Sequence, residues 1–599
     1  MDTKKLILAI ALSIIVIVIY QYFFMPKPTP RPQIPPAEVG KTVDGPESIE
    51  GVKSLPPEEG AAPKEGQDIL DIFSKKKEPV QKEKLPTVEP VSEDLKEQQV
   101  KDVVVETDLF TATFTNKGAG LKSFVFKKYN DDKQNPLDLI SAKVERFGLY
   151  PFYFSPFEEN EIYKKLNGAR FVYSGDMNVR VGKGGRKEIV FKYAEKDTNL
   201  YVLKKFVVAD GSYVMNVECR ILKDGKVLDA PFIFGPDLEN NVSTDRALQA
   251  GLKIGAYDGE DIRSVEFRKQ KTQPTGQQNI EVAEGTLSGY FYWSAYETTY
   301  FAAIFRIAKA DTNIKYNIIK EKAGKEQSLY SYMIVTNPGL VYMGPKDEEV
   351  LAGIGDSFAD INNVVEYGWF GSIAKIMLKG VVLVHKFVPN YGWAIIFFTL
   401  FLKILLFPLT YSSSVSMGKM QALQPKIKAI RKKYKNQRDP EQRRAMNAEM
   451  MALYKQEKVN PAGGCLPLLL QLPILWGLFR MLAVSINVRH EPWLLWITDL
   501  SVKDPYYVLP IVMGITQILL QKMTPAAAEG AQKKMMYIMP VVIVIFVMNL
   551  PSGLTLYWAF SNILQMGQQK IINDKIYKKK RAEEKEKKTL KRKKGSKKR

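Results

Sequence analysis

The pattern of hydrophobic and polar positions divides the chain into two parts of different character. Short alternating stretches follow one another between about residues 101 and 345, whereas long apolar runs dominate after residue 388. Alternation with a period of two is typical of strands with one buried face. An apolar run of about 20 residues is long enough to cross a bilayer as a helix. The pattern therefore predicts a β-rich domain followed by a membrane-spanning helical region.

The alternating part is predicted to form many short strands joined by tight turns. Residues 110–115 alternate, a turn with two glycines follows at 116–120, and a second strand continues at 121–126. Turn residues also stand at 210–212 and 223–225, between further strand-like runs at 188–193, 200–208 and 213–221. Many short strands at hairpin spacing are typical of a sandwich, so we expect a large β-sandwich domain over residues 101–345.

Six apolar runs are candidates for membrane spans. Five lie in the C-terminal half, at Tyr391–Leu409, Cys465–Ile486, Pro505–Gln521, Met535–Asn549 and Gly553–Ile572. The sixth, Leu6–Phe24, competes with a cleaved signal peptide, but it ends in aromatic residues followed by prolines rather than in small residues. We therefore expect an uncleaved anchor over residues 1–24 and a polytopic α-helical membrane protein with six transmembrane helices.

The distribution of charge predicts an orientation in the membrane. The formal net charge is +21, and the basic residues are concentrated: 411–460 carries 12 Lys or Arg against 4 acids, and 569–599 carries 16 against 4. Loops rich in Lys and Arg stay in the cytoplasm. This rule places both termini and the 411–460 loop in the cytoplasm and the β-domain outside. Such basic blocks also suit anionic partners, either lipid headgroups or nucleic acid.

The segments between these parts have compositions of their own. Residues 25–100 are rich in Pro, Glu and Lys, which predicts a disordered tether. The 361–388 stretch predicts an amphipathic helix on the outer membrane face, or a surface helix packed on the β-domain. Within 411–460, two apolar stripes with a helix start at Asp439-Pro440 predict an αα-hairpin. Its methionines either pack the stripes together or form an adaptable apolar surface. Residues 576–599 are a basic tail.

Catalytic and metal chemistry have little support in the sequence. The chain has two histidines, His385 and His490, and two widely separated cysteines, Cys219 and Cys465. We find no phosphate-binding loop of the GxxxxGK[ST] type, no GxSxG motif and no GxGxxG motif. We therefore expect no enzyme activity, no cofactor and no metal site.

The most informative polar residue is Lys403, which lies within the first C-terminal span. A cation at membrane depth costs at least ~2.5–3.5 kcal/mol on insertion scales, so it marks a functional cavity by default. The alternative is that the lysine reaches along the helix to the membrane surface. Helical side chains lean toward the N-terminus of their helix, which here points Lys403 away from the nearer, cytoplasmic surface. This geometry favours a water-filled pocket within the membrane.

Other polar side chains accompany Lys403 in the spans. Thr399 lies one helical turn earlier on the same face, and none of the later spans contains Asp or Glu. A cation without an acidic partner is typical of a hydrated groove that is open to one side and attracts acidic or polar peptide. Hydrogen bonds between helices are the alternative role for each of the neutral polar residues. The candidate groove residues are Lys403, Thr399, Gln471, Gln517, Tyr557 and Trp558.

These residues resemble those of the YidC family of membrane protein insertases, in order and in spacing, over about residues 390–575. The anchor, the outward β-domain and the basic tail resemble the Gram-negative form of the family. The matching stretches are Asn390–Ala394, Phe407–Thr410, Met420–Lys426, Glu449–Lys455, Lys458–Pro461, Gly463–Pro467, Gln471–Pro473, Asp504–Pro510 and Pro551–Tyr557.

The resemblance implies a function, a location and partners. It implies a five-helix insertase core over 389–575 in the bacterial inner membrane, with a periplasmic β-domain and a hydrophilic groove open to the cytoplasm. The groove cation is usually arginine, and here that position is Lys403, which keeps the charge without the two-pronged guanidinium. The implied clients are nascent membrane proteins, which the protein inserts and folds as an insertase and chaperone. Further implied partners are the Sec translocon (SecYEG with SecDF), the ribosome through the basic tail, and anionic lipids.

The resemblance also implies a hydrophobic slide along the second and fourth C-terminal spans, formed by Leu472, Pro473, Met539, Pro540 and Phe546. Two other classes of protein are alternatives to an insertase. A solute transporter usually shows internal repeats and paired broken helices, and we find no such repeat, although the Pro551–Gly553 break is of that kind. An intramembrane enzyme would need a catalytic dyad or a metal cluster, and the spans contain no such set of residues.

Overall fold

The structure is a computed structural model that describes residues 94–97, 99–158, 160–239, 252–274, 280–307, 311–323, 326–434, 439–457, 459, 466–524 and 531–596. The predicted anchor 1–24, most of the predicted tether 25–100, and Cys465 lie outside the described residues. The last residues of the predicted tether contact the β-rich domain, because Leu95 forms an isolated antiparallel bridge with Ala194.

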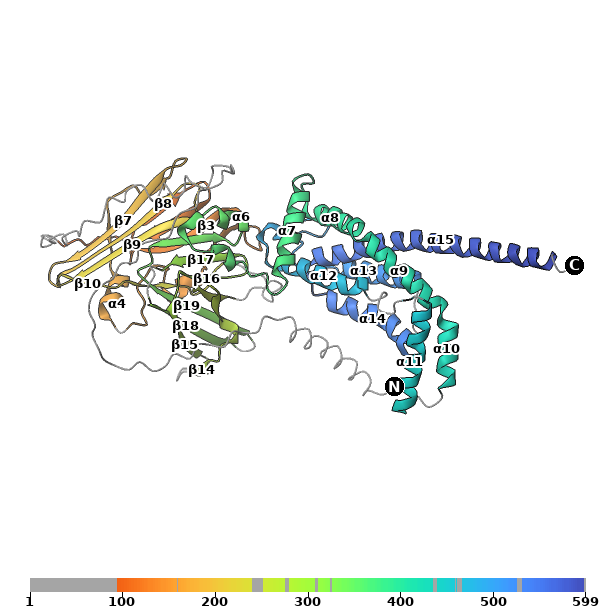
Figure 1. Ribbon diagram of the computed structural model, residues 1–599. Helices are drawn as coiled ribbons and strands as arrows, with labels where there is room; N and C mark the ends of the chain where they lie inside the picture. The colour runs from red at the N-terminus through yellow and green to blue at the C-terminus, as the bar shows by residue number, and fades with distance from the viewer. Residues whose placement is uncertain are drawn as a thin grey trace, which may run out of the picture. The chain divides into compact units, whose positions relative to one another are not determined.

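The β-rich domain contains three sheets, whose strands are drawn from orange to green in Figure 1. A ten-stranded sheet has the order β13-β12-β16-β17-β20-β9-β8-β7-β5, with β10 paired to β9, and two five-stranded sheets have the orders β4-β3-β2-β1-β6 and β11-β19-β18-β15-β14. The prediction of a β-rich domain is confirmed. The strands are β1 Asp102–Glu106, β2 Phe110–Thr115, β3 Gly120–Asn130, β4 Pro136–Asp138, β5 Val172–Tyr173, β6 Asn178–Arg180, β7 Arg186–Glu195, β8 Leu200–Ala209, β9 Val214–Lys223, β10 Lys226–Leu228, β11 Pro231–Phe234, β12 Lys253–Tyr257, β13 Ile262–Glu266, β14 Gln273–Pro274, β15 Ile280–Tyr290, β16 Trp293–Glu297, β17 Phe301–Arg306, β18 Asp311–Ala323, β19 Glu326–Thr336 and β20 Leu340–Pro345.

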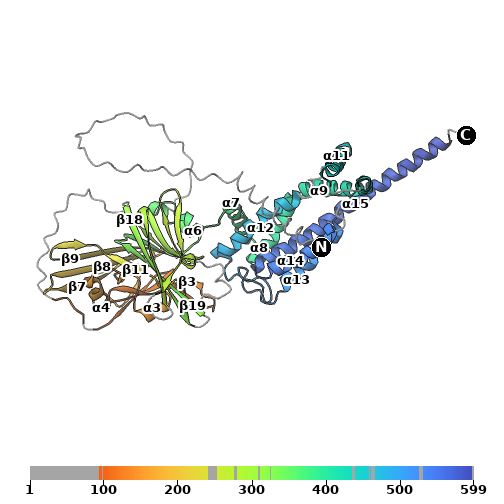
Figure 2. The same cartoon turned by 90° about the horizontal axis from the view of Figure 1, so that it is seen from below.

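The turns predicted from glycine and aspartate positions separate these strands. The turn between β2 and β3 places Gly118 at φ +64°, a left-handed conformation that favours glycine. A Cβ on Gly118 would also lie 2.6 Å from the ring of Tyr153, so the turn approaches that ring too closely for a side chain. Strands β7, β8 and β9 lie side by side as antiparallel neighbours, which Figure 2 shows from below.

Helices and short turns of helix cover parts of this domain and lead out of it. They are α3 Lys143–Phe147, α4 Glu161–Gly168, α6 Glu348–Ala352 and the 3-10 turns η1 Phe267–Lys269, η2 Gly355–Ser357 and η3 Ile361–Val364. Asn160 caps α4 and Asp347 caps α6, each by accepting hydrogen bonds from backbone N–H groups of the first turn.

The helical region follows from residue 371 and contains the apolar runs found in the sequence. Its elements are α7 Gly371–His385, α8 Tyr391–Leu405, α9 Phe407–Ala422, α10 Gln424–Lys433, α11 Pro440–Gln456, α12 Leu466–Val484, η5 Ile486–Val488, α13 Val508–Met523, α14 Ala531–Val547 and α15 Ser552–Ser596. Asp439 caps α11 by accepting a hydrogen bond from the N–H of Glu441, and Pro440 occupies its first turn, as predicted.

The predicted first span, Tyr391–Leu409, is not one straight helix. Helix α8 ends at Leu405, and α9 begins at Phe407 after a bend of 60°. Pro408 explains the bend, because proline has no N–H to offer the carbonyl of Ile404 and its ring clashes with the preceding turn. The bend therefore opens the last turn of α8, where Lys403 lies.

Several helices of the helical region expose apolar side chains. Helix α7 packs on α12 and α8, whereas α15 packs on α13, α8, α9 and α12, and α14 packs on α13. The exposed faces of α8, α13 and α14 are strongly apolar, which is typical of a surface that contacts another apolar phase. Large exposed apolar residues include Phe397, Phe401 and Ile404 on α8, Ile511 and Ile515 on α13, and Val541, Val542 and Ile545 on α14.

Among the described residues, no helix alone combines the length and the apolar composition that a bilayer crossing requires. Helices α8 and α9 meet this requirement only as a bent pair. Shorter apolar helices run over Gln471–Val484, Val508–Met523 and Ile538–Val547.

Within the β-rich domain, Lys204 is buried without a carboxylate partner among the described residues. Its Nζ donates hydrogen bonds to the carbonyls of Gly118, at 2.8 Å, and Phe152, at 2.7 Å. It also lies over aromatic rings, with 4.0 Å to the centroid of Phe154. Removal from water disfavours the charged form, and burial lowers the pKa of Lys204 to about 7.

This lowered pKa predicts a pH dependence of stability. An unfolded lysine titrates near 10.4, so the unfolded chain binds more protons than the folded chain between about pH 7 and 10, and stability rises with pH across that range. Lys204→Met should remove this rise, which amounts to at most about 1.4 kcal/mol per pH unit. Amide hydrogen exchange in β8 and β9 at pH 7 to 9 measures it. Lys205→Met is the control, because Lys205 pairs with Glu218 at 2.8 Å near the surface. If the free energy of unfolding varied with pH in the same way in the wild type and in Lys204→Met, the prediction would be contradicted.

Candidate functional site

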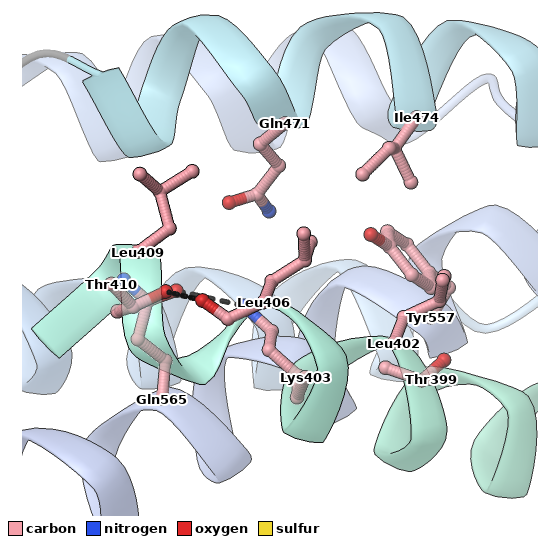
Figure 3. Close-up of a pocket in the computed structure, with 10 residues that line it drawn as sticks. All are labelled: Thr399, Leu402, Lys403, Leu406, Leu409, Thr410, Gln471, Ile474, Tyr557 and Gln565. Carbon is pink, nitrogen blue, oxygen red and sulfur yellow. Dashed lines mark hydrogen bonds between the residues drawn. The ribbon is translucent and has the colours of Figure 1, made fainter.

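The candidate site lies at the bend between α8 and α9, where side chains from α8, α9, α12 and α15 surround a small pocket (Figure 3). The pocket encloses about 490 Å³ of empty space, part of it open to solvent. Its lining combines one cation, several neutral polar groups and aliphatic side chains. The lining residues are Thr399, Leu402, Lys403, Leu406, Leu409, Thr410, Gln471, Ile474, Tyr557 and Gln565.

Lys403 provides the only charge of this lining. Its Nζ donates a hydrogen bond to Oε1 of Gln565, at 2.8 Å, as the dashed line in Figure 3 marks. Among the residues that the structure describes, no carboxylate forms an ion pair with Lys403. The ammonium is therefore solvated by the neutral amide of Gln565 and by any polar group that enters the pocket. No described carboxylate neutralises its positive charge.

The bend positions Lys403 through the backbone as well. The carbonyl of Lys403 belongs to the last turn of α8, where carbonyls run out of partners within the helix. Gln568 on α15 donates its side-chain N–H to this carbonyl, at 3.0 Å. One turn earlier, the hydroxyl of Thr399 donates to the carbonyl of Ile395, at 2.6 Å, which fixes the rotamer of a side chain that lines the pocket.

The structure brings together four of the six predicted groove residues. Thr399 and Lys403 on α8, Gln471 on α12 and Tyr557 on α15 all line the pocket. In Figure 3 the amide of Gln471 points from α12 toward the bend, and the side chain of Tyr557 lies beside Ile474.

Gln517 and Trp558 do not line this pocket. Trp558 follows Tyr557 directly, and successive residues of a helix point about 100° apart, so the two side chains face different neighbours. Trp558 packs instead against a buried cluster of Met513, Val547 and Ala559, from α13, α14 and α15. Gln517 is half-buried on α13.

Two polar lining residues were not predicted from the sequence. Gln565 lies eight residues after Tyr557 and thus near the same face of α15. Thr410 follows the proline bend, and its hydroxyl donates to the carbonyl of Leu406, at 3.0 Å. The helical spacing from Tyr557 was the signal that could have identified Gln565.

The predicted slide residues lie outside the pocket lining. Leu472, Met539 and Phe546 are exposed, Pro473 is half-buried within α12, and Pro540 is buried within α14. The two helices pack on different neighbours, since α12 contacts α7 and α15 whereas α14 contacts α13. Three of the five side chains therefore contribute to the exposed apolar surface rather than to the polar cavity.

Comparisons with known proteins cover both parts of the chain. A family model described as "60Kd inner membrane protein" matches residues 383–580, and one described as "YidC periplasmic domain" matches residues 102–379. A protein of Citrifermentans bemidjiense, named "Membrane protein insertase YidC", is 34% identical over 503 residues, with 80% of this chain and 86% of the relative covered. A protein of the same name from Geotalea uraniireducens is 33% identical over 500 residues, with 80% and 88% covered.

One solved structure is also similar, at 18% sequence identity and with a TM-score of 0.32. Its title is "Active YidC insertase crystal structure with the first transmembrane domain resolved", and the match covers 84% of this chain and 96% of that chain.

Proposed function

Because the chain belongs to the YidC family of membrane protein insertases, we propose that the pocket around Lys403 is the polar part of the groove through which its clients enter the membrane. The protein is an inner-membrane insertase with a periplasmic domain. The observation that carries the proposal is the ammonium of Lys403, which lies at a bend between apolar helices and has a neutral amide as its partner at 2.8 Å.

The charge of Lys403 explains how a polar client segment enters. A lysine ammonium has three N–H donors, and Gln565 accepts one of them. The other donors are available to a client carboxylate or backbone carbonyl. Gln471 and Tyr557 offer further hydrogen-bonding groups on the other side of the pocket. A short polar tail thereby exchanges water for protein partners instead of entering hydrocarbon unsolvated.

The apolar client segment follows a different surface. The exposed side chains of Leu472, Met539 and Phe546 form the slide, against which an apolar segment packs while it moves sideways into lipid. Pro473 and Pro540 lie inside α12 and α14 and shape these helices rather than contact the client. The insertion step needs no nucleotide, cofactor or covalent chemistry in this scheme.

The proposed topology has six membrane-spanning helices and both termini in the cytoplasm. The anchor 1–24 is the first span, the bent pair α8–α9 begins the insertase core, and α12 to α15 complete it. The charge distribution supports this orientation, because 411–460 carries 12 basic residues against 4 acids. In the same loop α10 and α11 pack together around Ile427, which supports the cytoplasmic αα-hairpin.

The proposed clients and partners are those that membership of the YidC family implies. Nascent membrane proteins are the clients, which the protein inserts and assembles alone or with the Sec translocon (SecYEG with SecDF). The basic C-terminal residues suit the ribosome, since 569–599 carries 16 Lys or Arg against 4 acids. The same residues suit anionic lipid headgroups, which would hold the tail at the membrane surface.

The first prediction from this function concerns the charge at Lys403. Lys403→Arg should preserve insertion, whereas Lys403→Ala and Lys403→Glu should reduce insertion of clients with acidic tails about tenfold, the equivalent of about 1.4 kcal/mol. Protease protection of a client in proteoliposomes, at matched protein levels, measures insertion. A client of equal length with a neutral tail is the control. Full insertion of the acidic client by Lys403→Glu would contradict the electrostatic groove.

A second prediction concerns the side from which water enters the pocket. After Cys219 and Cys465 are changed to Ser, a cysteine at Gln471 or Thr399 should react with a membrane-impermeant thiol reagent from the cytoplasmic side only. Gln517→Cys is the matched control outside the pocket lining and should react more slowly. A transporter with alternating access predicts reaction from both sides. Reaction in sealed right-side-out vesicles would therefore favour a transporter over an insertase.

The third prediction concerns the basic C-terminal residues. Deletion of residues 578–599 should weaken cosedimentation with ribosomes and leave the folding of the remaining chain unchanged, because the deleted residues are predominantly Lys and Arg. Cosedimentation at rising salt concentration measures the effect, since electrostatic binding weakens with salt. Undiminished binding by the truncated chain would restrict the tail to a lipid or topology role.

A further inference from the structure

Helix α15 carries a row of side-chain amides that faces the helices around the pocket. Their spacing of three or four residues, with one adjacent pair, places them on one side of the helix. Asn562 donates to the carbonyl of Met513 at 3.4 Å, and Asn573 donates to the carbonyl of Met523 at 3.1 Å, so the row contacts α13 at two levels. Between these two levels it contacts α8 and α9. The amide row consists of Asn562, Gln565, Gln568, Gln569 and Asn573.

Two members of the amide row hold Lys403 from opposite ends. Gln565 accepts a hydrogen bond from Nζ, at 2.8 Å, and Gln568 donates to the backbone carbonyl of the same lysine, at 3.0 Å. A third member, Gln569, accepts from the hydroxyl of Ser414 on α9, at 3.2 Å. Both sides of the α8–α9 bend are thus attached to a single helix.

The partner of Lys403 is neutral, although a carboxylate of the same shape would fit there. A glutamate at this position would form an ion pair with the ammonium and cancel its potential. Glutamine accepts one hydrogen bond and leaves the charge uncompensated. It also restrains a long flexible side chain, whose rotamer freedom would otherwise let it turn away from the pocket.

We infer that Gln565 is a positioning residue that holds the ammonium of Lys403 in the pocket without cancelling its charge, because the side-chain amide is neutral. The inference rests on the proposed function of the pocket. No described carboxylate of the chain pairs with the ammonium, so a client carboxylate takes the donors that Gln565 leaves free. A lysine lacks the planar, two-pronged guanidinium of arginine, so the orientation of its ammonium depends on a second residue. Gln565 is that residue.

The test uses substitutions that change charge without changing shape. Gln565→Glu in the full chain should reduce insertion of an acidic-tailed client about tenfold, the equivalent of about 1.4 kcal/mol. A neutral-tailed client of equal length should insert within about twofold of the wild-type level. Gln517→Glu is the matched control, because it adds the same charge to a half-buried glutamine outside the pocket lining and should leave the ratio of the two clients unchanged.

A second variant keeps the inference testable if Gln565→Glu lowers the amount of folded protein. The exchange Lys403→Gln with Gln565→Lys moves the ammonium from α8 to α15 within the same hydrogen-bonded pair. It should restore insertion of the acidic client relative to Lys403→Gln alone. A purely structural role for the pair predicts no such rescue.

The outcomes separate this inference from the proposed function. The positioning role would be overturned if Gln565→Glu reduced insertion of the acidic and the neutral client equally. It would also be overturned if the exchange did not restore insertion of the acidic client. If Gln565→Glu has no effect while Lys403→Glu impairs the acidic client, the positioning role fails and the groove stands. If neither variant affects the acidic client, the groove itself fails.

Discussion

An ammonium group placed in an apolar helix has to be solvated, and the arrangement of four helices around the α8–α9 bend follows from that requirement. Solvation of the ammonium by water alone would need an open channel. A carboxylate partner would neutralise the positive charge of the lysine. The structure instead offers neutral oxygens, with Gln565 nearest at 2.8 Å. The bend at Pro408 contributes to this solution, because residues from both sides of it, on α8 and α9, line the pocket in which the lysine lies.

Two other buried cations of the chain differ from Lys403 in having carboxylate partners. Lys346 is buried in the periplasmic domain and has the carboxylate of Glu297 at 2.6 Å. Arg489, with 4% of its side chain exposed, has Glu239 at 3.2 Å. Each of these two cations is paired with a carboxylate of the fold. The paired cation is therefore not available to bind another anion. Lys403 lacks such a partner among the described residues, so its charge remains available to an anionic group that enters the pocket.

Hydrophobic periodicity predicted the strands and helices well, because burial imposes a period of two or 3.6 on the sequence. Thr399 and Lys403 were expected on one face, and they line one pocket. The bend was missed because Phe407-Pro408 stands near the end of an apolar run, where a proline is equally compatible with a helix end. The sequence did not indicate that Trp558 and Gln517 lie outside the pocket lining, because polarity or aromatic character does not tell which way a residue faces. Gln565 was not identified because it lies among the closely spaced polar residues 565–570 near the end of the last predicted span, where composition does not single out one amide.

Helix α15 runs without interruption from the pocket to Ser596. At 1.5 Å per residue its 45 residues span about 68 Å, of which more than half lies beyond Gln565. Tyr557, Gln565 and the basic residues that follow them therefore belong to one continuous hydrogen-bonded helix. A partner that binds the basic end is connected to the residue that accepts the hydrogen bond of the Lys403 ammonium through helical backbone alone, with no loop between them.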